Sequence, residues 1–404
     1  MTALPEEGPQ GGLSLYVHVP FCQTKCPYCD FNTYQGIEAL MAPYLDALTT
    51  EIRLWGETLG RPPVVTVFFG GGTPSYIPPE QVARVLERVS HSFDLAPSAE
   101  VTLEANPGDV TGPALERWQR AGVNRLSIGV QSLDDSLLAL LGRRHTSAGA
   151  AAAYGLAVAS GLENVNLDLM YGLPAQTLDQ WRATLEGVLD LSPAHLSLYA
   201  LTLEEGTPLA RWVEDGGVPE PDPDLAADMY CLAREMLGGS GYDHYEISNW
   251  SVPGRRCRHN MAYWRNGQYL GVGPGAHSCL WGHRFWNVRP PRAYMDRLRQ
   301  WEEVGAARVE RLDEEALRRA GPVDGVEAIG PSLAMSETMF LGLRLLDGMS
   351  IGGFQSRFGR DPLVLYGPQV RELTGLGLLE HRDGLLRLTD RGCLLANQVF
   401  VRFL

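Results

Sequence analysis

The stretch Tyr16-Val-His-Val-Pro-Phe-Cys22-Gln-Thr-Lys-Cys26-Pro-Tyr-Cys29-Asp-Phe31 decides the fold of this chain. It begins inside an apolar, β-rich run, Leu13–Val19, and continues directly into three cysteines with C-x3-C-x2-C spacing. A cubane cluster of four irons usually takes four thiolates. The spacing predicts that Cys22, Cys26 and Cys29 hold such a cluster and leave one of its irons without a protein ligand.

An iron without a protein ligand suits a small molecule that can chelate it. S-adenosylmethionine can do so through its amino and carboxylate groups, and an electron from the cluster can then break a C–S bond of its sulfonium. A structural zinc ion is the alternative. Zinc prefers four ligands, often as two cysteine pairs, and the nearby fourth candidates are His18 and Asp30. The chain has 7 cysteines, and this odd number argues against a disulfide framework.

Short β-rich runs alternate with helical stretches from this motif onward. Strands are expected at Leu13–Val19, Val64–Phe69, Glu100–Glu104, Arg125–Val130, Asn164–Met170 and Leu196–Leu201. Helices are expected around Ala42–Trp55, Pro79–Ser90, Gly112–Ala121, Leu133–Leu141, Ser147–Ser160 and Leu178–Leu189. This alternation predicts an α/β fold with a parallel sheet. Because six such units are too few for a closed eight-stranded barrel, we expect an open, partial (β/α)6 barrel.

Glycine and polar residues gather at the ends of the second, third and fourth of these strands and within the last two. They are Gly70, Gly71, Gly72, Thr73, Glu104, Gln131, Ser132, Asp168, Tyr199 and Ala200. Each one alone is explained equally well as a structural cap. Together with the cysteines they predict a cofactor seat, because barrel enzymes build their sites at the carboxyl ends of the strands. The basic cluster Arg143, Arg144 and His145 is a candidate partner for a carboxylate, or else a solvated helix end.

The rest of the chain divides by composition. The expected parts are a disordered tail at 1–12, the barrel core at 13–205, an accessory segment at 206–320 and a C-terminal domain at 331–404. Arg258–Ser278 has the composition of a binding loop, and Gly321–Pro331 is a Gly/Pro-rich break before the last domain. The helices and hairpin of that domain, with Thr389 as the cap of its final helix, predict a winged-helix-like α+β unit. It lacks a basic stripe, so a structural or partner-binding role is favoured over nucleic-acid binding.

Charge and hydropathy limit the partners. The formal net charge is −14, which repels phosphate backbones, so nucleic acid is not expected as a partner. No apolar run approaches the roughly 20 residues that span a bilayer, so direct membrane insertion is not expected. Met1–Gly12 lacks the basic start and apolar stretch of a signal peptide. We therefore expect a cytoplasmic protein.

The last motif is Cys257-Arg258-His259-Asn-Met-Ala-Tyr263-Trp264. Histidine is a common haem ligand, and the aromatic rings could stack on a flat macrocycle. From composition alone, a histidine beside Asn and Tyr is more often just hydrogen-bonded. Cys257 is either a second ligand or a buried apolar filler.

Taken in order, these motifs resemble the radical S-adenosylmethionine family of oxygen-independent coproporphyrinogen III oxidases. The resemblance rests on the cysteine triad, Gly-Gly-Gly-Thr-Pro, Glu-Ala-Asn-Pro, Gly-Val-Gln-Ser and Asp-Leu-Met-Tyr-Gly-Leu-Pro, and it runs from about residue 13 to the C-terminus. It implies that the cysteines hold a [4Fe–4S] cluster. It also implies contacts to S-adenosylmethionine from Tyr16, Tyr28, Gly71, Gly72, Thr73, Glu104, Gln131, Arg143 and Asp168, with Arg143 chosen over Arg144 by its spacing from Gln131. No catalytic residue is assigned.

The chain departs from the oxidases of this family at one position. They carry a further cysteine two residues after the third, where this chain has Phe31, and they also carry a longer N-terminal segment. Instead, His259-Asn-Met-Ala-Tyr263-Trp264 is similar to the H-N-x-x-Y-W motif of the related haem chaperones called HemW. This resemblance implies a haem-binding protein with His259 as the haem ligand. Its partners would be haem-acceptor proteins, with respiratory proteins as candidates, and an electron donor. The alternative is an oxidase that converts propionates of coproporphyrinogen III to vinyl groups.

Overall fold

The computed structural model describes residues 12–306 and 313–404. The tail expected at 1–12 lies outside the described residues except for Gly12, and so does the first part of the charged segment that follows Ala306. Among the residues that are described, no helix is both long enough and apolar enough to cross a membrane.

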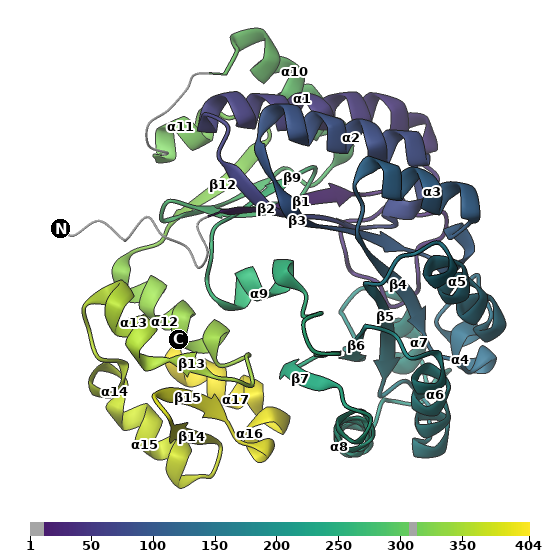
Figure 1. Cartoon of the computed structure of the whole chain (residues 1–404), viewed down its shortest axis with the longest axis vertical. Coiled ribbons are helices and arrows are strands. Elements are labelled where there is room, and N and C mark those ends of the chain that lie inside the picture. The colour runs from purple at the N-terminus through teal and green to yellow at the C-terminus, as the bar shows by residue number, and fades with distance from the viewer. Residues whose placement is uncertain (1–11, 307–312) are drawn as a thin grey trace.

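A parallel sheet forms one side of the molecule, with helices along its outer face (Figure 1). Its strands are β1 (Leu13–Val19), β2 (Pro63–Gly71), β3 (Asp94–Ala105), β4 (Arg125–Gln131), β5 (Val165–Tyr171) and β6 (His195–Ala200), paired in that order. The helices between them are α1 (Met41–Leu59), α2 (Pro79–Ser92), α3 (Gly112–Ala121), α4 (Asp135–Leu140), α5 (Ser147–Ala159) and α6 (Leu178–Leu191). This arrangement confirms the expected partial (β/α)6 barrel.

Successive side chains of β1 point alternately to the apolar layer under the helices and to the interior of the barrel. Leu15 and Val17 are fully buried in the apolar layer, which also receives Leu48 and Ile52 of α1. Tyr16 points to the opposite face, as the two-residue period of a strand requires. The barrel thus has an apolar outside, packed under helices, and an inside that carries polar and aromatic groups.

The sheet continues beyond the barrel at both edges. Beside β1 lie β9 (Tyr269–Val272), β10 (His277–Leu280), β11 (His283–Asn287) and β12 (Val323–Ala328), and beside β6 lie β8 (Asn249–Ser251) and β7 (Asp243–Glu246). The whole sheet has 12 strands, with β9 parallel to β1. Between and around them run α7 (Pro208–Glu214), α8 (Pro223–Gly239), α10 (Pro291–Val304) and α11 (Glu314–Arg319).

Two expectations from composition were therefore wrong. Arg258–Ser278 is not an open loop, because it contains helix α9 (Arg258–Trp264), strand β9 and the start of β10. Its glycines serve packing: a Cβ on Gly271 would lie 2.3 Å from the backbone oxygen of His277. The break at Gly321–Pro331 likewise contains β12, which joins the large sheet.

Helix α9 lies on the inner side of the barrel sheet, between the strands and the C-terminal elements (Figure 1). Those elements are α12 (Pro331–Gly342), β13 (Met349–Ser350), α13 (Ile351–Phe358), α14 (Pro362–Leu365), α15 (Gly367–Gly375), β14 (Leu379–Arg382), β15 (Leu385–Leu388), α16 (Asp390–Leu394) and α17 (Ala396–Phe400). The hairpin β14–β15 is present, and the Thr389 hydroxyl caps α16 by accepting the Gly392 N–H, as expected. The position of α9 makes it one of the contacts between the barrel interior and this domain.

Candidate functional site

The three cysteines lie on a closed loop just after β1. Backbone bonds from Tyr34 N to Pro20 O (2.8 Å) and from Cys22 N to Tyr34 O (2.9 Å) join the two ends of this loop. A tight turn, with Cys29 N bonded to Cys26 O at 3.1 Å, brings the second and third cysteines together. All three are free thiols, and all three line one cavity. Three thiols on one preformed loop fit the donor set of an iron–sulfur cluster.

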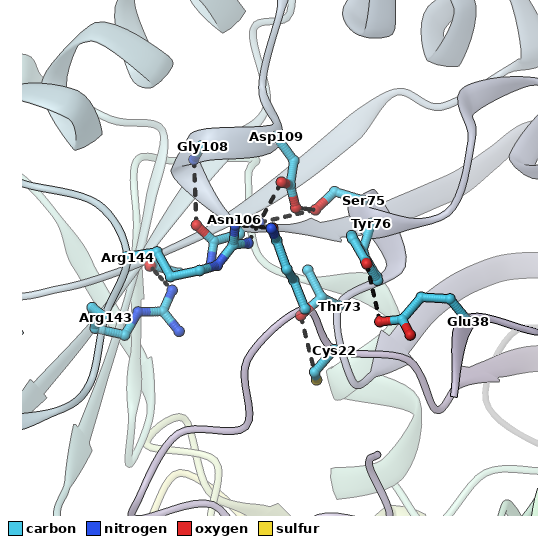
Figure 2. A network of polar contacts seen from close by, with 12 residues as sticks. Cys22, Glu38, Thr73, Ser75, Tyr76, Asn106, Gly108, Asp109, Arg143 and Arg144 are labelled. Atoms are coloured by element: carbon cyan, nitrogen blue, oxygen red, sulfur yellow. Dashed lines mark hydrogen bonds and ion pairs between the residues drawn. The ribbon is translucent and has the colours of Figure 1, made fainter. Parts of the chain in front are cut away.

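Hydroxyl groups and one guanidinium surround the thiols. Thr73 Oγ1 donates to Cys22 Sγ at 3.5 Å, as Figure 2 shows, and Arg143 Nη1 donates to Cys26 Sγ at 3.5 Å. Burial raises the pKa of the Cys22 and Cys29 thiols, so binding of a metal there releases protons. Within the described part of the chain, no three His, Cys, Asp or Glu side chains are arranged to hold a single metal ion.

The cavity has a volume of about 420 Å³ and opens at the carboxyl ends of the barrel strands. Besides the cysteines, it is lined by all but one of the residues expected to contact the cofactor: Tyr28, Gly71, Gly72, Thr73, Glu104, Gln131, Arg143 and Asp168. Tyr199 and Ala200 also line it. Ser132 and His145 are buried, and His145 Nε2 bonds to Val130 O at 3.0 Å. Most of the predicted residues therefore converge in space with the cysteine loop, whereas Gly70, Ser132 and His145 do not line the cavity.

Tyr16 is the one expected contact that does not line this cavity. Its ring stacks on Phe68, with 6.3 Å between ring centroids, and its hydroxyl shares a 3.1 Å hydrogen bond with His18 Nδ1. Tyr16 nevertheless lies next to the cavity residue Glu104. A Cβ on Gly70 would lie about 3 Å from both side chains. Tyr16 thus supports the floor of the cavity.

The glycine loop after β2 packs directly on the cysteine loop. Gly72 N donates to Val19 O at 2.7 Å, and a Cβ on Gly72 would lie 2.7 Å from that same oxygen. Gly71 has φ +106°, and its Cβ would lie 2.4 Å from the ring of His18. Only glycine fits such a backbone position at so close an approach. The glycines therefore hold the cysteine loop against β2.

A polar network joins the rims of neighbouring strands (Figure 2). Ser75 Oγ donates to Asp109 Oδ2 at 2.8 Å and accepts the Asn106 N–H at 3.0 Å, so the loops after β2 and β3 are tied together. Arg144 pairs with Asp109 at 3.7 Å and also donates to Gln23 of the cysteine loop. This network fixes three loops around one opening.

Two of the carboxyl groups that line the cavity, those of Glu104 and Asp168, are buried. Burial, together with the nearby Asp168, raises the pKa of Glu104 to about 8. Burial also raises the pKa of Asp168, although Ser127 Oγ (2.9 Å) and Asn166 Nδ2 (2.8 Å) donate to it and oppose that effect. Buried carboxylates are stabilised when a cation or several donors arrive. This end of the cavity therefore suits a ligand that brings a positive charge or hydrogen-bond donors.

Ser127 and Asn106 line the cavity as well and had not been anticipated. Ser127 is a polar residue on the inner face of an otherwise apolar strand, and this alternation was the signal that could have found it. Gln131 has a positive φ of 68° and follows a break in the register between β4 and β5. That bulge turns its side chain toward the cavity.

His259 is not at this cavity. It is buried in α9, its Nδ1 shares a 2.8 Å hydrogen bond with Thr66 Oγ1, and its Nε2 shares a 2.9 Å bond with the Tyr263 hydroxyl. Its ring stacks on Phe68 with 5.0 Å between centroids. Burial and the nearby Arg125 lower the pKa of His259 to about 3, so the ring is neutral. In this arrangement both ring nitrogens are engaged.

Glu100 holds the start of α9 inside the barrel. Its carboxylate accepts the backbone N–H groups of Arg258 and His259, each at 3.0 Å. Cys257 is fully buried, and its thiol lies 3.7 Å from the same carboxylate. A carboxylate at a helix N-terminus satisfies otherwise unpaired N–H groups and favours the helix dipole. The sequence alone carried no signal for this contact, since 157 residues separate Glu100 from Cys257.

Comparisons with known proteins agree with this geometry. Residues 16–188 match the model of the radical SAM superfamily, and residues 332–395 match that of the HemN C-terminal domain. The chain is 39% identical over 405 residues to the haem chaperone HemW of Mycobacterium tuberculosis, covering 98% of this chain and 96% of the relative. It is 34% identical over 394 residues to the haem chaperone HemW of Bacillus subtilis, covering 97% and 99%.

The fold also matches a solved structure. Coproporphyrinogen III oxidase (HemN) from Escherichia coli, described as a radical SAM enzyme, superposes with a TM-score of 0.82 over 98% of this chain and 90% of that one. At 23% identity this likeness concerns the fold. Membership of the radical SAM superfamily implies a [4Fe–4S] cluster and S-adenosylmethionine, and the three thiols beside a carboxyl-lined cavity fit both. By its near full-length similarity, the chain belongs to the HemW family of radical S-adenosylmethionine proteins.

Proposed function

We propose that this protein is a cytoplasmic haem chaperone, which binds haem and transfers it to acceptor proteins while carrying a [4Fe–4S] cluster and S-adenosylmethionine. The observation that carries the proposal is the similarity along nearly the whole chain to relatives named haem chaperones. Phe31 adds to it. It lines the mouth of the cavity with 65% of its surface exposed, at the position where the oxidases of the family carry a further cysteine.

We assign the cluster to Cys22, Cys26 and Cys29, and the cofactor to the cavity beside them. Glu104 would accept the ammonium group of the methionine part, and Asp168 would accept hydroxyl groups. Tyr28 packs beside Leu137 and Leu141 and offers an aromatic wall. The reduced cluster, when bound, supplies the electron that breaks a C–S bond of the sulfonium. The protein's own residues position the ligand and keep water away from it.

These assignments have a direct test. Cys26→Ser should abolish the visible absorbance of the anaerobically reconstituted cluster, whereas Cys231→Ser should not, because Cys231 is exposed on α8 and lies outside the cavity. Retention of a full cluster in each of the single variants at 22, 26 and 29 would sink the cluster assignment.

We propose His259 as the haem ligand. Its buried position means that the protein must open before haem can reach it. An iron atom can bond to Nε2 only after the Tyr263 hydroxyl has left it, and the ring is buried beneath β2. Haem binding through His259 therefore requires α9 to leave its place inside the barrel. This opening would be a slow step before binding, and it would expose Cys257 together with His259.

The test is a haem titration combined with a turnover assay on one anaerobic preparation. A stoichiometric Soret band is expected for the wild type and its loss for His259→Ala. The matched control is His195→Ala, which removes another fully buried histidine with both ring nitrogens bonded, outside the motif. An unchanged Soret band in His259→Ala would refute this ligand.

The second candidate is the oxidase activity, which the shared fold favours. If the preparation converts coproporphyrinogen III while consuming S-adenosylmethionine, the chaperone proposal fails. The proposed partners are haem, haem-acceptor proteins with respiratory proteins as candidates, and an electron donor. Nucleic acid and membrane insertion are not part of the proposal.

A further inference from the structure

Arg143 makes a fork of hydrogen bonds between the cysteine loop and the barrel. Its Nη1 donates to Cys26 Sγ at 3.5 Å, and its Nη2 donates to Gly129 O at 2.6 Å. The guanidinium is planar and keeps its charge at all ordinary pH values. Anchored on the β4 backbone by one nitrogen, it presents the other to sulfur in a fixed direction.

The chain around Arg143 is shaped for this contact. Gly142 has φ +64°, and a Cβ there would lie 2.8 Å from Cδ of Pro27, the residue that follows Cys26. Arg143 N donates to Leu138 O at 2.9 Å, which closes the turn at the end of α4. The turn is thus pressed directly on the cysteine loop. A side chain at residue 142 would push Arg143 away from the thiol.

The neighbouring Arg144 provides a natural contrast. It carries the same charge one residue further on, but its guanidinium pairs with Asp109 and Gln23. Figure 2 shows the two arginines side by side, with Arg144 joined to the rim network. A carboxylate partner offsets the charge of Arg144. Arg143 has no carboxylate partner among the ion pairs of the described residues, so its charge acts on its neighbours, the Tyr28 hydroxyl and the Cys26 thiol.

A hydrogen bond from a cation to a cluster thiolate has a definite consequence. Reduction adds one negative charge to the cluster and its ligands, and hydrogen bonds to the sulfurs stabilise the more negative state. Coulomb attraction weakens with distance and with exposure to water, and Arg143 and Cys26 are in direct contact and only partly exposed. We propose that Arg143 raises the reduction potential of the cluster by donating to the Cys26 thiolate. This role is separate from a contact with the cofactor, for which the Nε of Arg143 is still unpartnered in the described structure.

The proposal is tested without haem and without S-adenosylmethionine, so it does not depend on the proposed chaperone function. Wild type, Arg143→Gln, Arg143→Lys and Arg144→Gln are reconstituted anaerobically, and the cluster is titrated potentiometrically with EPR detection of the reduced state. Arg143→Gln should lower the equilibrium constant for reduction at least tenfold, which is about 59 mV for one electron. Arg144→Gln should shift it much less, and Arg143→Lys should lie between the two.

Equal shifts in Arg143→Gln and Arg144→Gln would overturn the proposal, because a general change of charge would then explain both. An unchanged potential in Arg143→Gln would also overturn it. Iron content and the oxidised absorbance spectrum are measured on each sample, so that a potential is compared only between proteins with full clusters.

A second measurement covers the case in which Arg143→Gln does not assemble a cluster. Wild-type protein is grown with 15N-labelled arginine, and the reduced cluster is studied by pulsed EPR. A weak 15N coupling is expected in the wild type and in Arg144→Gln, and none in Arg143→Lys. If the wild type lacks this coupling, or Arg143→Lys retains it, Arg143 does not donate to the cluster.

Discussion

The Tyr263 hydroxyl lies 2.9 Å from Nε2 of His259, one helical turn away on the same face of α9. The two residues belong to one motif, and in the closed arrangement one of them blocks the other. The tyrosine therefore acts as an internal competitor for the nitrogen that we propose as the haem ligand. This relationship makes the haem proposal open to test at a residue other than the ligand itself.

Tyr263→Phe should bind haem faster and more tightly than the wild type. The change leaves a buried ring nitrogen without its partner, which destabilises the closed state by about 1 kcal/mol, or roughly fivefold in the opening equilibrium. Stopped-flow measurement of Soret absorbance gives the rate. Tyr269→Phe is the control. Tyr269 packs against the Tyr263 ring, but among the described residues its hydroxyl makes no hydrogen bond to His259. Weaker binding by Tyr263→Phe would contradict a blocking role.

Glu100→Gln should loosen α9 without unfolding the barrel. The carboxylate accepts two N–H groups at the start of the helix, and loss of such a charged cap costs about 1–2 kcal/mol. Amide hydrogen exchange within 258–264 should become roughly tenfold faster, while exchange in β1 and β2 stays unchanged. Glu116→Gln removes an exposed carboxylate from α3 and serves as the control. Equal exchange rates in wild type and Glu100→Gln would show that the cap does not hold α9.

The cofactor affinity should depend on pH through Glu104. Burial raises the pKa of this group to about 8, so below pH 8 it is protonated in the ligand-free protein. A ligand that requires the carboxylate must displace that proton, and its affinity then rises with pH by up to tenfold per unit until it levels off above about pH 8. The affinity for S-adenosylmethionine is measured for the wild type and for Glu104→Gln at each pH, and the two values are divided. Ionisation of the ligand affects both proteins equally, so the ratio reports the ionisation of Glu104 alone. A ratio that is flat between pH 6 and pH 8 would exclude ionisation of Glu104 on binding.

The sequence predicted the barrel well because its signals are local. Each strand is a short apolar run with a polar or glycine residue at its end, as in Phe69-Gly70-Gly71, and strand ends meet at one edge of a parallel sheet. The cavity residue Glu104 followed from that rule, whereas Asp168 lies in the middle of β5 and stood out as a carboxyl group in a mostly apolar strand. The placement of β9 did not, because a four-residue run interrupted by Gly271 is too short to be recognised alone, and its pairing with β1 and β10 defines it.

The position of His259 shows the other limit of sequence reasoning. A motif identifies residue types that act together, but not the face of the fold on which they lie. Whether His259 meets solvent or a buried wall depends on Thr66 and Glu100, which are distant in the chain and look like ordinary strand residues. Only the three-dimensional contacts reveal that the proposed haem binding at this residue would require movement of α9.

Gly71→Ala should destabilise the cysteine loop, although the substitution adds only one methyl group. The residue has φ +106°, and the added methyl would lie 2.4 Å from His18, whose ring is fixed by Asn32 O at 3.0 Å and by Tyr16. Backbone strain and overpacking together cost about 2–4 kcal/mol. We expect a lower melting temperature and a reduced iron content after reconstitution. Gly112→Ala is the matched control, because a methyl there would meet nothing within 4 Å. If Gly71→Ala binds iron and melts as the control does, the glycine does not hold the cysteine loop in place.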